Sequence, residues 1–177
     1  GRSSRDFTLA VKTNPRQNTI FLPNGSVLNI DGRTGRLSLN DQFIIPADVD
    51  AYEFSQSGKY LYCTKHDEYF FYISRYKVQE LEHGIAGGEE IIYKGKVEYS
   101  GRGASRTTPT LFRHPNSTLY CFCYNYYISK LEDPDSETPV FVPYAVELPS
   151  KLDSKVPFAH YLRFSSIPCA APRIIPE

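Results

Sequence analysis

The sequence has 177 residues, of which 41% are hydrophobic and 23% charged, a composition typical of one globular domain and not of a disordered chain. Twenty basic residues balance twenty acidic residues, so the chain lacks the basic excess that is usual in nucleic-acid-binding proteins. No apolar run reaches the roughly 18 residues needed to cross a bilayer. We therefore expect neither nucleic acid nor a membrane as a partner.

Short apolar segments bounded by turn residues predict β-strands along most of the chain. They are residues 19–22, 26–30, 36–39, 51–54, 59–63, 69–73, 110–113, 118–124 and 126–128. Fourteen Tyr and eleven Phe strengthen this prediction, because aromatic residues favour half-buried strands. Only residues 75–83 suggest a helix, with Val78 and Leu81 three positions apart and Gly84 as a stop, and an edge strand is the alternative.

The predicted fold is all-β, made of antiparallel meanders. Residues 1–138 form a meander repeat domain in this interpretation. Residues 139–177 are rich in proline, which interrupts central strands and long helices. We expect this second part to be an extended segment that packs on the domain or on a partner.

Two stretches of the chain, residues 59–76 and 118–131, share one pattern, which we call the echo. In both, Leu-Tyr-Cys is followed by Tyr-Ile-Ser and a basic residue. A third, earlier segment shares part of the spacing: an aromatic residue, a tight turn, a leucine seven positions on, and a small apolar residue two further on. The three sets are Phe21, Leu28 and Ile30; Phe54, Leu61 and Cys63; and Phe112, Leu119 and Cys121. This spacing predicts a structural unit used three times, with the residue two after the leucine in the core.

These units resemble degenerate β-propeller blades over residues 19–133. "FSQSGKYLYC" followed by "YFFYIS" is similar to the middle strands of a WD-type blade, and "NGSVLNIDGRTGRLSL" is similar to the blade-closing phrase of quinoprotein-like propellers. The resemblance implies a non-catalytic interaction or scaffold domain. Since a propeller has about four to eight blades, we expect either a fourth unit within residues 139–166 or a place in a larger assembly.

A second resemblance is to forkhead-associated domains, carried by "FLPNGSVLNIDGRTGRLSLNDQFI" with its Gly32-Arg33 pair. It implies a phosphopeptide-binding module in which Arg33 contacts phosphate, and Arg36 is a further candidate binding residue. The Ser and His that this family places before the next strand are absent here, where residues 46–50 read Pro-Ala-Asp-Val-Asp.

Tyrosine-rich segments supply the other candidate binding residues. Residues 69–72 and 124–127 place aromatic side chains on both faces of a strand. If one face is exposed, these tyrosines suit a protein interface, and otherwise they belong to the core. The candidates are Tyr69, Tyr72, Tyr124, Tyr126 and Tyr127.

The cysteines and histidines allow a zinc site in principle, because Cys63, His66, Cys121 and Cys123 include typical ligands. The spacing described above favours a core position for Cys63 and Cys121 instead. No catalytic motif occurs, so we predict no metal, no cofactor and a non-enzymatic role, with a metal-dependent or hydrolytic enzyme as the alternative. The expected partner is another protein or peptide.

The compartment is predicted from weak signals. The chain is too long to need disulfides for stability, which favours an intracellular protein. The glycosylation sequons at Asn24 and Asn116 would matter only in a secreted one.

Overall fold

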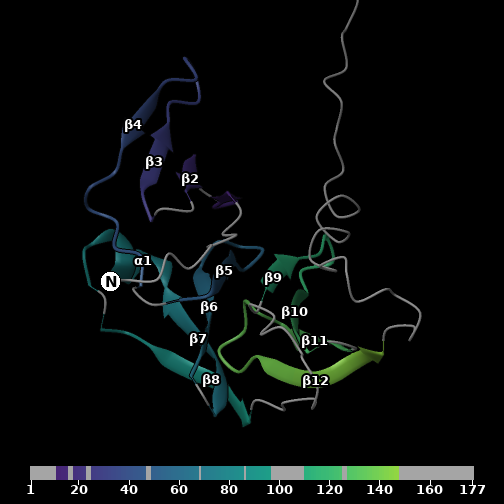
Figure 1. Cartoon of the computed structure of the whole chain (residues 1–177). Coiled ribbons are helices and arrows are strands. Elements are labelled where there is room, and N and C mark those ends of the chain that lie inside the picture. The colour runs from purple at the N-terminus through teal and green to yellow at the C-terminus, as the bar shows by residue number, and fades with distance from the viewer. Residues whose placement is uncertain are drawn as a thin grey trace, which may run out of the picture.

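The computed structural model describes residues 11–15, 18–22, 25–46, 49–67, 69–85, 87–96, 110–124 and 127–147. It confirms the all-β prediction, because these residues form three four-stranded antiparallel sheets that follow one another in chain order (Figure 1). Within each sheet the strands are neighbours in sequence order, as in a meander. No helix in this part of the chain is long and apolar enough to span a membrane.

The strands are short in the first sheet and longer in the other two. Sheet 1 contains β1 (Lys12–Thr13), β2 (Thr19–Phe21), β3 (Val27–Ile30) and β4 (Leu37–Leu39); sheet 2 contains β5 (Ala51–Phe54), β6 (Tyr60–His66), β7 (Phe70–Lys77) and β8 (Glu90–Lys96); sheet 3 contains β9 (Thr110–Arg113), β10 (Leu119–Tyr124), β11 (Tyr127–Glu132) and β12 (Val140–Glu147).

A short helix, α1 (Val78–Glu82), connects β7 to β8, as the spacing of Val78 and Leu81 predicts. The helix is shorter than the predicted one, residues 75–83, because β7 extends to Lys77. Both Val78 and Leu81 are buried in the core beside sheet 1. The helix ends where Gly84 takes a positive φ of 76° and the Ile85 N–H donates to the Glu80 carbonyl oxygen.

The first hairpin of each predicted unit contains the same backbone hydrogen bond. The N–H of Gly25, Gly58 or Ser117 donates to the carbonyl oxygen three residues earlier, and each of these residues has a positive φ between 70° and 84°. Glycine adopts this conformation without a steric penalty, which explains two of the three positions. The turn-forming residues in the sequence therefore located all three turns.

Sheet 2 lies between the other two sheets, and each of its faces is buried in a separate core. One core joins Phe21 and Val27 of sheet 1 to Phe54, Leu61 and Cys63 of sheet 2. In sheets 2 and 3, we call the face that packs on the preceding sheet the N-side face, and the opposite one the C-side face. In sheet 1, the C-side face is the one that packs on sheet 2, and the opposite one is the N-side face. On β6, side chains alternate between these faces, as the pleat of a strand requires.

The second core joins the C-side face of sheet 2 to the N-side face of sheet 3. Tyr60, Tyr62, Phe71 and Ile73 of sheet 2 pack there against sheet 3. The residues from sheet 3 are Leu111, Leu119, Cys121 and Leu131. Both interfaces thus pair a C-side face with an N-side face.

The echo in the sequence is a repeat of strand register between sheets 2 and 3. Tyr62 pairs with Arg75 and Cys63 with Ser74. In sheet 3, Tyr120 pairs in the same way with Lys130, and Cys121 with Ser129. The prediction of a shared unit is therefore confirmed for these two strand pairs. The leucine and cysteine of each echo lie on the N-side face, and its tyrosine on the C-side face.

The predicted equivalence of the first unit is wrong by one strand. Sheet 1 begins with β1, so β2 occupies the place of β6, and Phe21 is not the counterpart of Phe54. Ile30 accordingly is half-buried and belongs to neither core, whereas Val27 is buried. Phe112 is also displaced, because Leu119 pairs with Arg113 while Leu61 pairs with Phe54. The cause is the turn in sheet 2, which is one residue longer.

The start of the proline-rich segment completes sheet 3. β12 pairs with β11 as an edge strand, which tolerates Pro143 because one side of the strand has no partner strand. The expectation of a fourth unit within residues 139–166 is therefore wrong for Val140–Glu147, because these residues belong to the third sheet. Residues 148–177 lie outside the described part of the chain.

Candidate functional site

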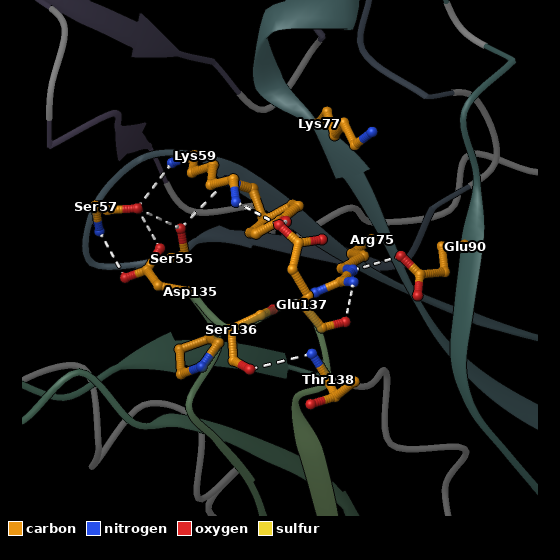
Figure 2. Close-up of polar contacts among 12 residues, drawn as sticks. Ser55, Ser57, Lys59, Arg75, Lys77, Glu90, Asp135, Ser136, Glu137 and Thr138 are labelled. Carbon is orange, nitrogen blue, oxygen red and sulfur yellow. Dashed lines mark hydrogen bonds and ion pairs between the residues drawn. The ribbon is translucent and has the colours of Figure 1, made fainter.

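A cluster of polar side chains joins sheet 2 to the turn between β11 and β12 of sheet 3 (Figure 2). We call this cluster, made of Ser57, Lys59, Tyr62 and Arg75, the polar grip. At its centre is Arg75 on β7, whose side chain is 3% exposed. Its Nη1 donates to the Ser136 carbonyl oxygen at 2.6 Å and its Nη2 to the Glu137 carbonyl oxygen at 2.7 Å. Its Nε donates to Glu90 Oε2 at 2.6 Å, and the guanidinium lies 4.4 Å from the ring centre of Tyr60. One buried cation thus orders a whole turn of the next sheet.

Further contacts hold the same turn. The Tyr62 hydroxyl donates to the Pro134 carbonyl oxygen at 2.7 Å in a buried position. The Ser57 backbone N–H and hydroxyl both donate to the Asp135 carboxylate, and Lys59 Nζ donates to Glu137 Oε1 at 2.7 Å. The Lys59 bond lowers the pKa of the Glu137 carboxyl, but both groups are exposed, so this pair adds little to stability.

A second polar contact joins the first strands of the three sheets. Lys12 of β1 donates through Nζ to Glu53 Oε2 of β5 at 2.5 Å and to the Leu111 carbonyl oxygen of β9 at 3.1 Å. The Glu53 side chain is 7% exposed, so the ion pair is largely shielded from water. The first strand of sheet 1 therefore contacts the first strand of each of the other sheets.

The most exposed aromatic residue of the described chain lies at the β6–β7 hairpin. Tyr69 is 68% exposed, and its neighbours Phe70 and Tyr72 are half-buried. Lys94 of β8 lies 4.1 Å from the ring centre of Phe70 and 5.3 Å from that of Tyr72. We call Tyr69, Phe70, Tyr72 and Lys94 the β6–β7 aromatic surface.

Asp67 fixes the shape of this surface. Its Oδ1 accepts the N–H groups of Tyr69 at 2.7 Å and Phe70 at 2.6 Å, and its Oδ2 accepts the Tyr72 hydroxyl at 3.0 Å. The N–H groups of Tyr69 and Phe70 are the main reason why the pKa of the Asp67 carboxyl is lowered. Asp67 thus links the backbone of Tyr69 and Phe70 to the side chain of Tyr72.

The predicted binding residues lie on three different sheets. Arg33 and Arg36 are exposed on the β3–β4 turn, where Asp31 Oδ1 accepts the N–H groups of Arg33 at 2.8 Å and Thr34 at 3.0 Å. These bonds lower the pKa of the Asp31 carboxyl, so a negative charge lies in the same turn as the two arginines. Tyr69 and Tyr72 belong to the β6–β7 aromatic surface.

The other predicted tyrosines lie at the β10–β11 hairpin. Tyr124 pairs with Tyr127 across the two strands. Tyr127 is half-buried and its ring contacts that of Tyr144 edge to face, with centres 5.2 Å apart. Tyr126 lies outside the described residues. Among the predicted residues that are described, the structure thus places Arg33 with Arg36 on one turn, Tyr69 with Tyr72 on one surface, and Tyr124 opposite Tyr127 in the strand register.

The two cysteines whose side chains the structure describes, Cys63 and Cys121, do not share one site. Cys63 lies in the core between sheets 1 and 2, and Cys121 in the core between sheets 2 and 3, as the spacing predicts for core residues. Burial raises the pKa of the Cys63 thiol. His66 contacts Asp50 instead, with Nδ1 and Oδ2 2.6 Å apart. Among the residues described above, no cluster of three His, Cys, Asp or Glu could hold a metal ion.

Sequence reasoning missed the residues of the polar grip. Arg75 and its carbonyl partners are about sixty positions apart, so no local pattern connects them. The available signal was a charged residue inside an otherwise apolar strand, "FFYISRY", together with the basic residue at the matching place of the echo, Lys130.

Comparisons with known proteins find similarity among solved structures alone. No protein-family model matches the sequence, and no curated protein matches it. Among solved structures, the chain is similar to Kuenenia stuttgartiensis hydrazine synthase, with 16% sequence identity and a TM-score of 0.46. The alignment covers 84% of this chain but 40% of that one, so this chain spans less than half of its length. The similarity concerns the arrangement of strands and assigns no activity to this chain.

Proposed function

We propose that this chain is a non-catalytic protein-interaction domain whose three sheets are consecutive propeller-like blades. Support for the blades comes from the packing of the C-side face of one sheet on the N-side face of the next at both interfaces. The contact of β1 with both β5 and β9 agrees with inner strands gathered around a common centre. A rigid array of this kind presents its hairpins as binding loops.

The observation that carries the proposal is the β6–β7 aromatic surface. Tyr69 is 68% exposed and contributes little to either core, yet Asp67 accepts its backbone N–H and that of Phe70. Ordered aromatic residues lose little conformational entropy on binding, which is why tyrosine is enriched among residues that dominate binding energy. Lys94 adds a positive charge next to the rings. We infer that another protein or peptide binds here.

The test is a quantitative pull-down with the full chain as bait. A double substitution, Tyr69→Ala with Lys94→Ala, removes the exposed ring and the cation while leaving both cores unchanged. The control is Ile91→Ala, which removes a 58% exposed apolar side chain from the same strand as Lys94.

The expected result is a protein captured equally by the wild-type and control baits and at least tenfold less by the double variant. That protein, purified, should bind the wild-type chain directly with the same dependence on Tyr69 and Lys94. If every captured protein is retained equally by all three baits, this surface is not a binding site and the proposal fails.

A further inference from the structure

The N-side face of sheet 1 is apolar and belongs to neither core. Strand pairing aligns Ile20, Leu28 and Leu39 across this face, and Ile30 with Leu37 beside them. Leu37 and Leu39 are 56% and 58% exposed. In sheets 2 and 3 the N-side face is the one buried against the preceding sheet. Sheet 1 therefore presents a face of the kind that another sheet covers.

The C-side face of sheet 3 is the second such surface. Phe112 and Tyr120 stack on it with ring centres 5.3 Å apart, and Val140 at its edge is 54% exposed. None of these residues belongs to the core between sheets 2 and 3. The two end sheets thus leave one N-side face and one C-side face without a facing sheet in the described chain.

The C-side face of sheet 3 repeats the residues with which sheet 2 holds its neighbour. Tyr120 and Lys130 pair across β10 and β11 as Tyr62 and Arg75 pair across β6 and β7. In sheet 2, the tyrosine and the basic residue reach backbone carbonyl oxygens of the following sheet's last turn. Sheet 3 consequently carries a tyrosine and a cation at the matching positions. Lys130 Nζ lies 2.5 Å from Glu132 Oε1 of the same strand, so it would exchange or share this partner in the contact.

We propose that a second copy of this chain covers these faces, with the C-side face of sheet 3 of each copy packed on the N-side face of sheet 1 of the other. The interface continues the pairing of faces already used twice within the chain. Such a head-to-tail contact must close on itself or polymerise. Two copies bring six sheets together, which lies within the roughly four to eight blades of closed propellers.

The turn that Tyr120 and Lys130 would contact is identified by its place in the sheet. The β11–β12 turn, held by sheet 2, precedes the last strand of sheet 3. Its counterpart in sheet 1 is the β3–β4 turn, residues 31–36, which carries the carboxylate of Asp31 and backbone carbonyl oxygens as well as the exposed Arg33 and Arg36. The acceptors for Lys130 of one copy are therefore the Asp31 carboxylate and the carbonyl oxygens of this turn. This inference does not depend on the β6–β7 aromatic surface.

The experiment measures the mass of the full chain in solution by light scattering or sedimentation. The expected species has twice the 20.2 kDa of one chain. Leu39→Glu on the N-side face, and Lys130→Glu on the C-side face, should each shift the protein to monomer at concentrations where the wild type is dimeric. Ser38→Glu is the matched control, because Ser38 is exposed on the opposite face of the same strand and should leave the dimer intact.

Head-to-tail pairing is tested by cross-linking two differently tagged copies. A copy with Leu39→Cys should form a disulfide with a copy carrying Tyr120→Cys, and neither variant should cross-link efficiently to itself. A monomeric wild type overturns the proposal and indicates that residues outside the described part cover these faces. A dimer unaffected by Leu39→Glu and Lys130→Glu, or efficient Leu39→Cys self-cross-linking, also overturns it.

Discussion

Replacing Arg75 by methionine should uncouple sheet 3 from sheet 2. The change removes two charge-assisted hydrogen bonds from the buried guanidinium group to the carbonyl oxygens of Ser136 and Glu137, and leaves both acceptors without these donors. Such bonds contribute about 1.5–3 kcal/mol each, and breaking a buried charged contact typically costs about 3–5 kcal/mol. The ion pair with Glu90 adds little, because the Glu90 side chain is 55% exposed. We expect a loss of about 3–5 kcal/mol in the free energy of unfolding.

The assay is urea unfolding followed by far-UV circular dichroism, since the chain has no tryptophan. Lys77→Met is the control, because Lys77 is on the same strand with a 60% exposed side chain and should change stability by less than about 0.5 kcal/mol. Amide exchange should also rise across β9–β12 more than across β1–β4 in the Arg75 variant. A loss below about 1 kcal/mol, or exchange that rises equally in all three sheets, would refute the reasoning.

Three further predictions concern single groups. Tyr62→Phe should cost about 1–2 kcal/mol in the same urea assay, because it leaves the buried Pro134 carbonyl oxygen without its donor, and an unchanged midpoint would contradict this bond. Burial raises the pKa of Tyr52 from 10 to about 12 and raises that of Cys63 above its usual 9. Since the unfolded chain then loses protons first, stability should fall as the pH rises above about 9, and a urea midpoint constant from pH 8 to 11 would be inconsistent with it. Arg33→Ala should abolish binding of a phosphothreonine peptide, measured by fluorescence anisotropy, if the forkhead-like interpretation is right; a wild-type chain that does not bind such a peptide rejects that interpretation.

Local sequence signals predicted nine of the twelve described strands, all except β1, β8 and β12, together with the hairpin turns, because the causes of these elements are local. Alternating apolar residues and turn residues such as Gly25 and Gly58 depend only on the pleat of a strand and on backbone conformation. The core positions of Cys63 and Cys121 followed from the same alternation.

The alignment of units failed where one residue matters. A hairpin longer by a single residue changes which side chain lies opposite Leu61 or Leu119, and a spacing rule cannot detect this. The two-residue β1 was too short to recognise, so sheet 1 was assigned from its second strand. Packing of one sheet on another, and hence the grip of Arg75, depends on residues distant in sequence and had no local signal.

The bridge made by Lys12 has a consequence for the order of folding. Its partner carbonyl at Leu111 is 99 positions further along the chain, so this contact closes a very long loop. At a synthesis rate of about 5–20 residues per second, roughly 5–20 seconds pass between the emergence of the two residues. The lysine of β1 that contacts both β5 and β9 is thus among the first described residues to be made, yet its last acceptor becomes available only when the third sheet begins to form. The first sheet is therefore the earliest of the three to be synthesised, but its anchoring is complete only after the first strand of the third sheet has been made.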